Sequence, residues 1–242
     1  MKNYFNIEID EDNIPTHIGI ILDGNRRWAK KRGLPPMEGH RAGAENLDKI
    51  IKFSKKIGIK ILSVYAFSTE NWNRSPAEVN FLMNLLMEYF KTKLDLFQEN
   101  KIKIVHSGRF NKIPSPTKMA IQNAVKKTKN NDEFIFNVCF NYGGRAEILD
   151  AIRKIYRDIK KKKFSIRKLN EKSFYQFLYH PEIPDPDLII RTSGEIRTSN
   201  FLLWQSAYSE WYFTKTLWPD FDEKELIKAI KDYQKRNRRF GK

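Results

Sequence analysis

Cysteine is almost absent from this sequence, since Cys139 is the only one among 242 residues. A single thiol excludes an intramolecular disulfide and any zinc site built from several cysteines. The four histidines are scattered, and no apolar run approaches the ~18 residues that span a membrane. Residues 1–13 are acidic, lack the apolar stretch of a signal peptide and are expected to be flexible. We therefore expect a cytoplasmic protein with a single domain over residues 1–242.

Two signatures of nucleotide-binding folds, G-x-x-x-x-G-K and G-x-G-x-x-G, are also missing. Basic residues are in strong excess, with 45 Lys and Arg against 29 Asp and Glu and a net charge of +16. The excess is concentrated in 151–175, with ten basic against two acidic residues, and in 224–242, with eight against two. Solvated helix faces are the simplest interpretation, and peripheral contact with an anionic membrane at its inner face is the alternative. Aromatic residues lie mostly in apolar runs rather than between basic residues, so no nucleic-acid partner is expected.

Short apolar blocks alternate with longer amphipathic segments along the chain. The expected strands are 17–22, 59–67, 102–107, 134–140, 188–191 and 211–214. The expected helices are 41–57, 77–97, 115–129, 145–161, 171–178 and 222–236. Continuous apolar strands are typical of a sheet that is buried on both faces. The alternation predicts an α/β fold with a central, mostly parallel sheet flanked by helices.

The expected helix at 77–97 has an unusual composition. In its first half the apolar residues cover well over one face. A helix with this pattern is deeply buried or contacts apolar groups on two sides. A central core helix, a dimer contact and the wall of an apolar ligand cavity are all compatible with it.

The first of three polar clusters follows the expected strand at 17–22. This strand ends on Asp23, which is followed by Gly24, Asn25, Arg26 and Arg27. Glycine lets backbone amides approach a phosphate, and a following helix N-terminus favours anions. A carboxylate beside an anion site suggests Mg²⁺, which uses one or two carboxylates together with substrate phosphates. Asp-Gly is also an ordinary turn, so this cluster alone does not decide between the two interpretations.

The other two clusters follow the strands at 59–67 and 188–191. One places hydroxyl, carboxylate, amide and guanidinium groups within 68–74, and the other places two arginines and several hydroxyls around Gly194. A capping loop and surface ion pairs are the ordinary explanations. Because ligands bind at the carboxyl ends of parallel strands, the fold can bring all three clusters together. Together they predict two anion sites, a carboxylate-bound metal and an adjacent apolar helix, which suits a diphosphate with a long apolar tail.

Several long motifs follow one another in the chain: HIGIILDGNRRWAKKRG, GHRAG, YAFSTENWNR, FNYGGR, IRTSGEIRTSNFLLWQ and LWPDF. Over residues 14–241 the chain resembles the cis-prenyltransferase (isoprenyl transferase) family, and within it the bacterial undecaprenyl diphosphate synthases. The resemblance implies a homodimeric α/β domain with a six-stranded sheet and a hydrophobic tunnel. It also implies a Mg²⁺-dependent transferase that adds isopentenyl diphosphate units to an allylic diphosphate, usually farnesyl diphosphate. A product of undecaprenyl length would serve as a cell-wall precursor.

The resemblance assigns roles position by position. Asp23 and Asn71 match catalytic residues, and Asp23 with Glu210 matches metal-linked carboxylates. The residues that match the allylic diphosphate site are Gly24, Asn25, Arg26, Arg27, His40 and Arg74, with Arg26 contributing only its backbone because relatives vary at that position. Those that match substrate-positioning groups are Trp28, Phe67, Ser68, Glu70 and Trp72. The isopentenyl diphosphate site is matched by Arg191, Arg197, Ser199, Arg239 and Gly241, the last two acting on the partner subunit. Tunnel positions are matched by Ala66, Phe81, Leu85, Leu86, Phe90 and Phe140.

Two positions depart from the family pattern. Pro36 stands where relatives often carry an arginine for the allylic diphosphate. That contact is lost or comes from another cation, the candidates being Lys30, Lys31 and Arg32. Ile196 stands where some relatives have a histidine that joins the metal.

The product length and the catalytic competence of the chain follow from the same resemblance. Ala66 is small, which suits a long tunnel, and we expect a product near undecaprenyl length. A shorter product, a different primer and a non-catalytic accessory subunit are the alternatives. The accessory role is disfavoured because such relatives have lost the catalytic aspartate, whereas Asp23 is present here.

Overall fold

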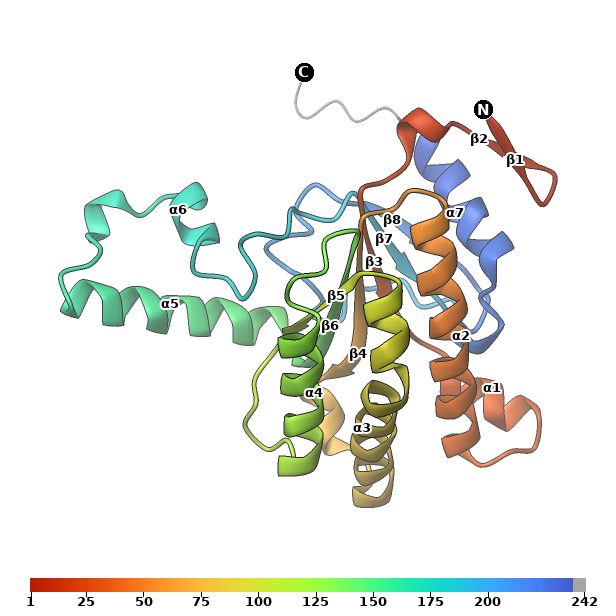
Figure 1. The fold of residues 1–242 in the computed structure, drawn as a ribbon, viewed down its shortest axis with the longest axis horizontal. Helices are drawn as coiled ribbons and strands as arrows, with labels where there is room; N and C mark the ends of the chain where they lie inside the picture. The colour runs from red at the N-terminus through yellow and green to blue at the C-terminus, as the bar shows by residue number, and fades with distance from the viewer. Residues whose placement is uncertain (237–242) are drawn as a thin grey trace.

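The structure is a computed structural model that describes residues 1–236, and a six-stranded sheet forms its centre (Figure 1). The strands are β3 (His17–Ile21), β4 (Ile61–Ser68), β5 (Ile102–Ser107), β6 (Phe134–Tyr142), β7 (Leu188–Arg191) and β8 (Glu210–Phe213). They lie in the order β5-β6-β4-β3-β7-β8, and every neighbouring pair is parallel. The six expected strands are confirmed, and the sheet is parallel throughout.

The helices are α1 (Asn25–Lys31), α2 (Pro36–Lys56), α3 (Pro76–Glu99), α4 (Ser115–Lys127), α5 (Gly144–Lys160), α6 (Glu171–Tyr175) and α7 (Glu223–Gln234). Short 3₁₀ helices are η1 (Glu11–Asn13), η2 (Thr69–Asn73), η3 (Ile166–Lys168) and η4 (Trp218–Asp220). Helix α3 begins with a side-chain cap, because the Ser75 hydroxyl accepts a hydrogen bond from the Glu78 backbone N–H. Within residues 1–236 no helix is both long and apolar enough to span a bilayer.

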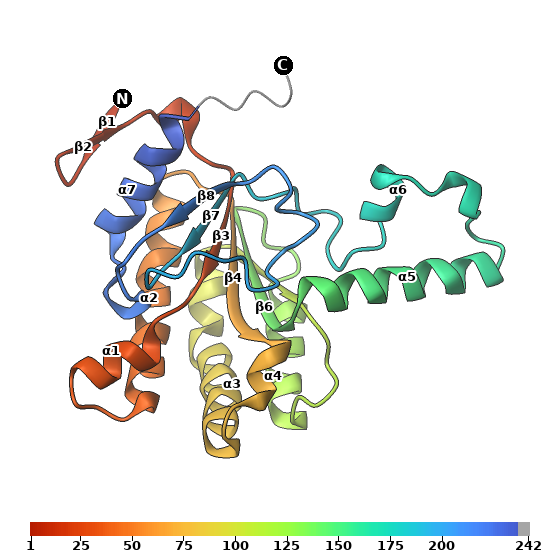
Figure 2. The same ribbon diagram turned by 180° about the vertical axis from the view of Figure 1, so that it is seen from behind.

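The two faces of the sheet are covered differently. Figure 1 shows α2, α3 and α4 side by side over one face. Figure 2, from behind, shows the other face under the long connections around β7 and β8, with α5 projecting away from the sheet. Because the strands are parallel, the carboxyl ends of β3, β4 and β7 lie together at the same end of the sheet, where α1 and η2 begin.

Residues 1–13 contain regular structure that the sequence analysis did not predict. Strands β1 (Lys2–Tyr4) and β2 (Ile7–Ile9) form an antiparallel hairpin. Ile9 is fully buried, and the Asp10 backbone N–H donates to the Gln234 side chain of α7 at 2.9 Å. The hairpin could not be predicted from its acidic composition, because its contacts are with α7, far away in the sequence.

Candidate active site

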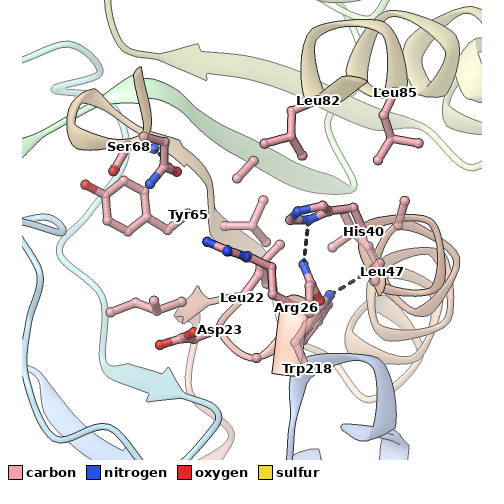
Figure 3. Close-up of a pocket in the computed structure, with 18 of the residues that line it drawn as sticks. Leu22, Asp23, Arg26, His40, Leu47, Tyr65, Ser68, Leu82, Leu85 and Trp218 are labelled. Carbon is pink, nitrogen blue, oxygen red and sulfur yellow. Dashed lines mark hydrogen bonds between the residues drawn. The ribbon is translucent and has the colours of Figure 1, made fainter. Parts of the chain in front are cut away.

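A cavity of about 1120 Å³ lies at the carboxyl ends of β3, β4 and β7 and continues between the sheet and helices α2 and α3 (Figure 3). Its polar end is lined by Asp23, Gly24, Asn25, Arg26, Arg27, Lys30, His40, Ser68, Glu70, Asn71, Arg74, Arg191, Arg197, Ser199 and Asn200. Its apolar end is lined by Leu47, Val64, Ala66, Leu82, Leu85, Leu86, Tyr89, Phe90, Phe136, Val138 and Phe140. In Figure 3, Leu82 and Leu85 of α3 face the cavity opposite Leu47 of α2. The three polar clusters of the sequence therefore meet in one site.

Asp23 follows β3 and is held by arginines from two other elements. Its Oδ2 accepts a hydrogen bond from Arg191 Nη2 at 2.9 Å, and its Oδ1 lies 3.4 Å from Arg27 Nη2. Burial alone would raise the pKa of the Asp23 carboxyl, but the hydrogen bond and charge of Arg191, with Arg27 and Ser193, lower it below its ordinary value. The carboxylate therefore stays ionised at neutral pH, and 29% of the side chain is exposed.

Arg191 is a buried cation at the end of β7, with 4% of its side chain exposed. Its Nη1 donates to the Arg197 carbonyl oxygen and to Ser199 Oγ, both at 2.6 Å, while its Nε is buried without a partner. The loop that it holds has left-handed backbone at Ser193, Ser199 and Asn200, with φ of 80°, 47° and 67°. Such conformations persist only where the surroundings impose them, and they are common at functional sites. The loop after β7 is therefore shaped around this guanidinium.

Glu78 organises the opposite side of the polar end, and the sequence analysis missed it. Its Oε1 accepts from Arg74 Nη1 at 2.9 Å and lies 3.1 Å from His40 Nε2, while Oε2 lies 4.0 Å from Arg26 Nη1. Burial would raise the pKa of this carboxyl, but the contacts with His40 and the arginines lower it. For His40 burial has the opposite effect and lowers the pKa, because the charged form of an imidazole is the protonated one. Its Nδ1 faces Asn25 Nδ2 at 3.5 Å. Glutamate is common at this position of a helix start, so the sequence carried no functional signal for it.

The loop after β4 joins the second cluster to the third. Asn71 Oδ1 accepts from the Ser68 backbone N–H at 3.1 Å, which closes the first turn of η2. Glu70 Oε1 accepts from Asn200 Nδ2 at 2.9 Å, so the loops after β4 and β7 are connected across the cavity mouth. Asn200 also lines the cavity, and the sequence analysis had not singled it out.

Five expected site residues among those that the structure describes do not line the cavity: Trp28, Phe67, Trp72, Phe81 and Glu210. The first three contact neighbouring residues. The Nε1–H groups of Trp28 and Trp72 donate hydrogen bonds to the side chains of Asp220 and Asn141, and the Phe67 ring packs against Phe140. Phe81 is not among the lining residues, and its ring packs near His40 and Arg41. The lining positions of α3 are 82, 85, 86, 89 and 90, which share one side of the helix, and residue 81 is turned away from that side.

Glu210 does not share a metal ion with Asp23 within one chain. It begins β8 and pairs with Leu188, which is in register with Ile18, five residues before Asp23. Because each residue of a strand advances about 3.3 Å, Glu210 lies near the amino ends of the strands and Asp23 lies beyond their carboxyl ends. Glu210 instead accepts a hydrogen bond from Arg236 Nη1 at 2.7 Å. Among the described residues, no three His, Cys, Asp or Glu side chains gather as metal ligands.

The remaining expectations concern cations. Of the three candidates to replace the arginine missing at Pro36, only Lys30 lines the cavity, which Pro36 also lines. Arg32 lies over the Trp28 ring at 4.1 Å and donates to Asp220 at 3.2 Å. The predicted contributions of Arg239 and Gly241 lie outside the described residues.

Several known proteins are similar to this chain in sequence and in structure. The family model described as "Putative undecaprenyl diphosphate synthase" matches residues 21–241. Isoprenyl transferases from Fusobacterium nucleatum and Thermotoga maritima are 53% and 50% identical, covering 96% and 94% of this chain and 97% of each relative. The structure of lavandulyl diphosphate synthase from Lavandula x intermedia, in complex with dimethylallyl diphosphate, matches with a TM-score of 0.91 and 36% identity, over 96% of this chain and 100% of that chain. A "probable undecaprenyl diphosphate synthase" from Campylobacter jejuni matches with a TM-score of 0.79 and 33% identity, over 95% of this chain and 100% of that chain. The chain therefore belongs to the undecaprenyl diphosphate synthase family of cis-prenyltransferases.

Proposed function

We propose that this enzyme extends farnesyl diphosphate with successive isopentenyl diphosphates, each added with a cis double bond, to a polyprenyl diphosphate of about undecaprenyl length. The observation that carries the proposal is one cavity with cationic side chains at one end and apolar side chains at the other. Its volume of about 1120 Å³ exceeds the usual range of about 300–1,000 Å³ for small-molecule sites. A long hydrocarbon tail attached to a diphosphate needs this combination.

The cations fall into two groups that suit two diphosphates. Arg26 and Arg74, together with the imidazole of His40, converge on Glu78 beside the start of α1, which has no side-chain cap. We assign the allylic diphosphate to this group, with Lys30 as an additional cation. Arg197 and Ser199, held by Arg191, form the second group, to which we assign isopentenyl diphosphate.

Asp23 suits a Mg²⁺ ion. Its ionised, partly exposed carboxylate lies between the two cationic groups, and Mg²⁺ is commonly bound by one carboxylate together with substrate phosphates. When bound, the ion would neutralise charge that develops on the departing diphosphate. The hydrogen bond from Arg191 keeps the Asp23 carboxylate oriented in this place.

In the proposed reaction the allylic C–O bond breaks and the isopentenyl double bond supplies the electrons of the new C–C bond. Arg26 and Arg74 stabilise the negative charge of the leaving diphosphate. Asn71, fixed by the Ser68 N–H, positions the isopentenyl chain beside the allylic carbon. The C2 proton then leaves, and we assign it to the released diphosphate because both ring nitrogens of His40 already face Glu78 and Asn25.

The proposal is tested by incubating the purified protein with farnesyl diphosphate, labelled isopentenyl diphosphate and Mg²⁺. Mass spectrometry should show a ladder of products that ends near undecaprenyl diphosphate and disappears without Mg²⁺. Chiefly short products would contradict the assigned length. Incorporation with a shorter allylic primer, but not with farnesyl diphosphate, would contradict the assigned primer. No incorporation with any primer would favour an accessory subunit.

We also propose a homodimer. Leu149, Ile152 and Tyr156 form an apolar stripe on α5, the helix that projects from the sheet, and their exposed fractions are 51%, 50% and 57%. An exposed stripe of this kind on a projecting helix suits burial against a second copy. Light scattering after gel filtration should give twice the chain mass, and Ile152→Glu should reduce it to one. A monomeric wild-type protein would contradict the proposal.

Peripheral membrane contact is proposed from charge alone. The basic stretches at 151–175 and 224–242 would attract anionic lipid headgroups while the apolar product leaves. Co-sedimentation with anionic vesicles should fall as salt is raised, and it should be absent with neutral vesicles. Equal binding to both kinds of vesicle, or none to either, would contradict this proposal.

A further inference from the structure

Polar contacts join the two helical walls of the cavity at Tyr89. Tyr89 of α3 lines the cavity together with Leu47 and Phe90. Its hydroxyl donates to Oδ1 of Asp48 on α2 at 2.8 Å. Lys93, one turn further along α3, places Nζ 2.5 Å from Oδ2 of the same carboxylate. One carboxylate of α2 thus contacts two turns of α3.

Charged side chains connect α2 and α3 at both ends of the cavity. At the polar end His40 of α2 lies 3.1 Å from Glu78 of α3, and at the deep end Asp48 meets Tyr89. Between these levels the cavity lining of α2 includes Gly43 and Ala44. Such small side chains leave space between the helices at these levels.

Asp48 and Lys93 are not among the residues that line the cavity, so Tyr89 stands between them and the cavity. The Lys93 side chain is 36% exposed and that of Asp48 16%, whereas Tyr89 is 8% exposed. Burial, with the Asp48 charge, raises the pKa of the Tyr89 hydroxyl well above its ordinary value, so this group remains a hydrogen-bond donor. The Tyr89 ring also packs against Phe90 and Phe97, which fixes its place in the wall.

We propose that Asp48, Tyr89 and Lys93 form a latch that ends the product tunnel and limits the length of the polyprenyl chain. This inference rests on the proposed function. With the latch closed, the tip of the growing chain meets a hydrogen-bonded phenol and an ion pair. Further growth must separate Tyr89 from Asp48, which leaves a mostly buried carboxylate with one donor fewer. Elongation then becomes unfavourable relative to release of the product.

The latch is tested by the distribution of product lengths, measured by mass spectrometry with farnesyl diphosphate, isopentenyl diphosphate and Mg²⁺. Tyr89→Phe removes only the hydroxyl, and Asp48→Asn removes only the charge. Both variants should shift the distribution to longer chains than the wild type makes. If either variant fails to fold, Lys93→Met, on the exposed side of the latch, should give a smaller shift in the same direction.

Tyr179 offers a matched control, because its hydroxyl donates to Asp150 Oδ2 at 2.7 Å and it does not line the cavity. Tyr179→Phe should keep the wild-type distribution. Unchanged or shorter products from folded Tyr89→Phe and Asp48→Asn, or an equal shift in Tyr179→Phe, would overturn the latch. A wild-type protein that makes no long product would overturn the proposed function instead.

Discussion

On the face of the sheet covered by α2 and α3, Val64 and Val138 line a cavity, whereas on the opposite face their neighbours Ser63 and Asn137 belong to a buried chain of hydrogen bonds. The same strands supply both faces, because successive side chains of a strand point to opposite sides. One face therefore leaves room for a ligand, and the other contains polar groups that must find partners inside the protein.

The hydrogen-bonded chain crosses four strands. His17 Nε2 lies 2.7 Å from Ser63 Oγ, Asn137 Nδ2 donates to the same oxygen at 2.9 Å, and Ser107 Oγ donates to Asn137 Oδ1 at 2.8 Å. His17 Nδ1 lies 2.7 Å from the Pro184 carbonyl oxygen, which can only accept, so Nδ1 carries the proton. Because each group has a defined partner, this network specifies the strand register. Changes on the cavity side should therefore alter the reaction, and changes on this side should alter stability.

The largest effect is expected at the polar end of the cavity. Asp23→Asn should lower kcat/KM about 10³-fold, because the carboxylate charge is lost where diphosphates bind. The melting temperature should change little, since an amide can still accept from Arg191. Steady-state kinetics gives kcat/KM, and thermal unfolding gives the melting temperature. Asp220→Asn is the control, because this carboxylate bonds Trp28 and Arg32 outside the cavity; an equal loss there would contradict the prediction.

The next effect concerns the opposite face. Ser63→Val should lower the free energy of unfolding by about 3 kcal/mol, because His17 and Asn137 lose a buried partner. The kcat/KM value should stay close to that of the wild type. Urea unfolding measures the first quantity. Thr92→Val, a change at an exposed hydroxyl of α3, should have a much smaller effect, and equal effects of the two variants would refute the role of the network.

The buried histidine makes the same network sensitive to acid. Burial lowers the pKa of His17 from 6.5 to about 4, and His106 is lowered similarly. Between these pKa values the unfolded chain binds protons that the folded chain does not, so stability falls as pH decreases. For His17 alone the loss from pH 7 to pH 5 is about 2 kcal/mol. Urea unfolding at a series of pH values in this range measures the free energy of unfolding. This free energy should depend less steeply on pH in His17→Gln than in the wild type, and an equally steep dependence would contradict the prediction.

The smallest effect on stability is expected inside the cavity. Ala66→Leu adds a side chain where space exists, so it should shorten the products while the free energy of unfolding changes by less than about 1 kcal/mol. Ala151→Leu is the matched control, because Ala151 is fully buried in a separate cluster and does not line the cavity. It should destabilise the protein without shortening the products. Shortening by both variants would show that product length does not depend on the cavity.

The polar residues that line the cavity could largely be predicted from the chain. Asp23, Asn71 and Arg191 each lie at or shortly after the end of an apolar strand, and parallel strands bring such ends together. Glu78 escaped prediction because it occupies an ordinary capping position, and only the fold places it against His40. The position of Glu210 at the start of β8, far from Asp23 of the same chain, could not be predicted because motif matching does not show at which end of a strand a residue lies.

Apolar periodicity and turn residues by themselves determined the strands, the helices and the edge of the sheet that carries the polar groups, because these features depend on local sequence. Tertiary structure alone decided which groups meet. The Arg191–Asp23 pair spans 168 positions in the chain, and the latch at Asp48 and Tyr89 spans 41. The first contact depends on the pairing of β3 with β7, and the second depends on the distance between α2 and α3 and on which helical face turns inward. Those distances are set by the packing of the whole core, and no local pattern encodes them.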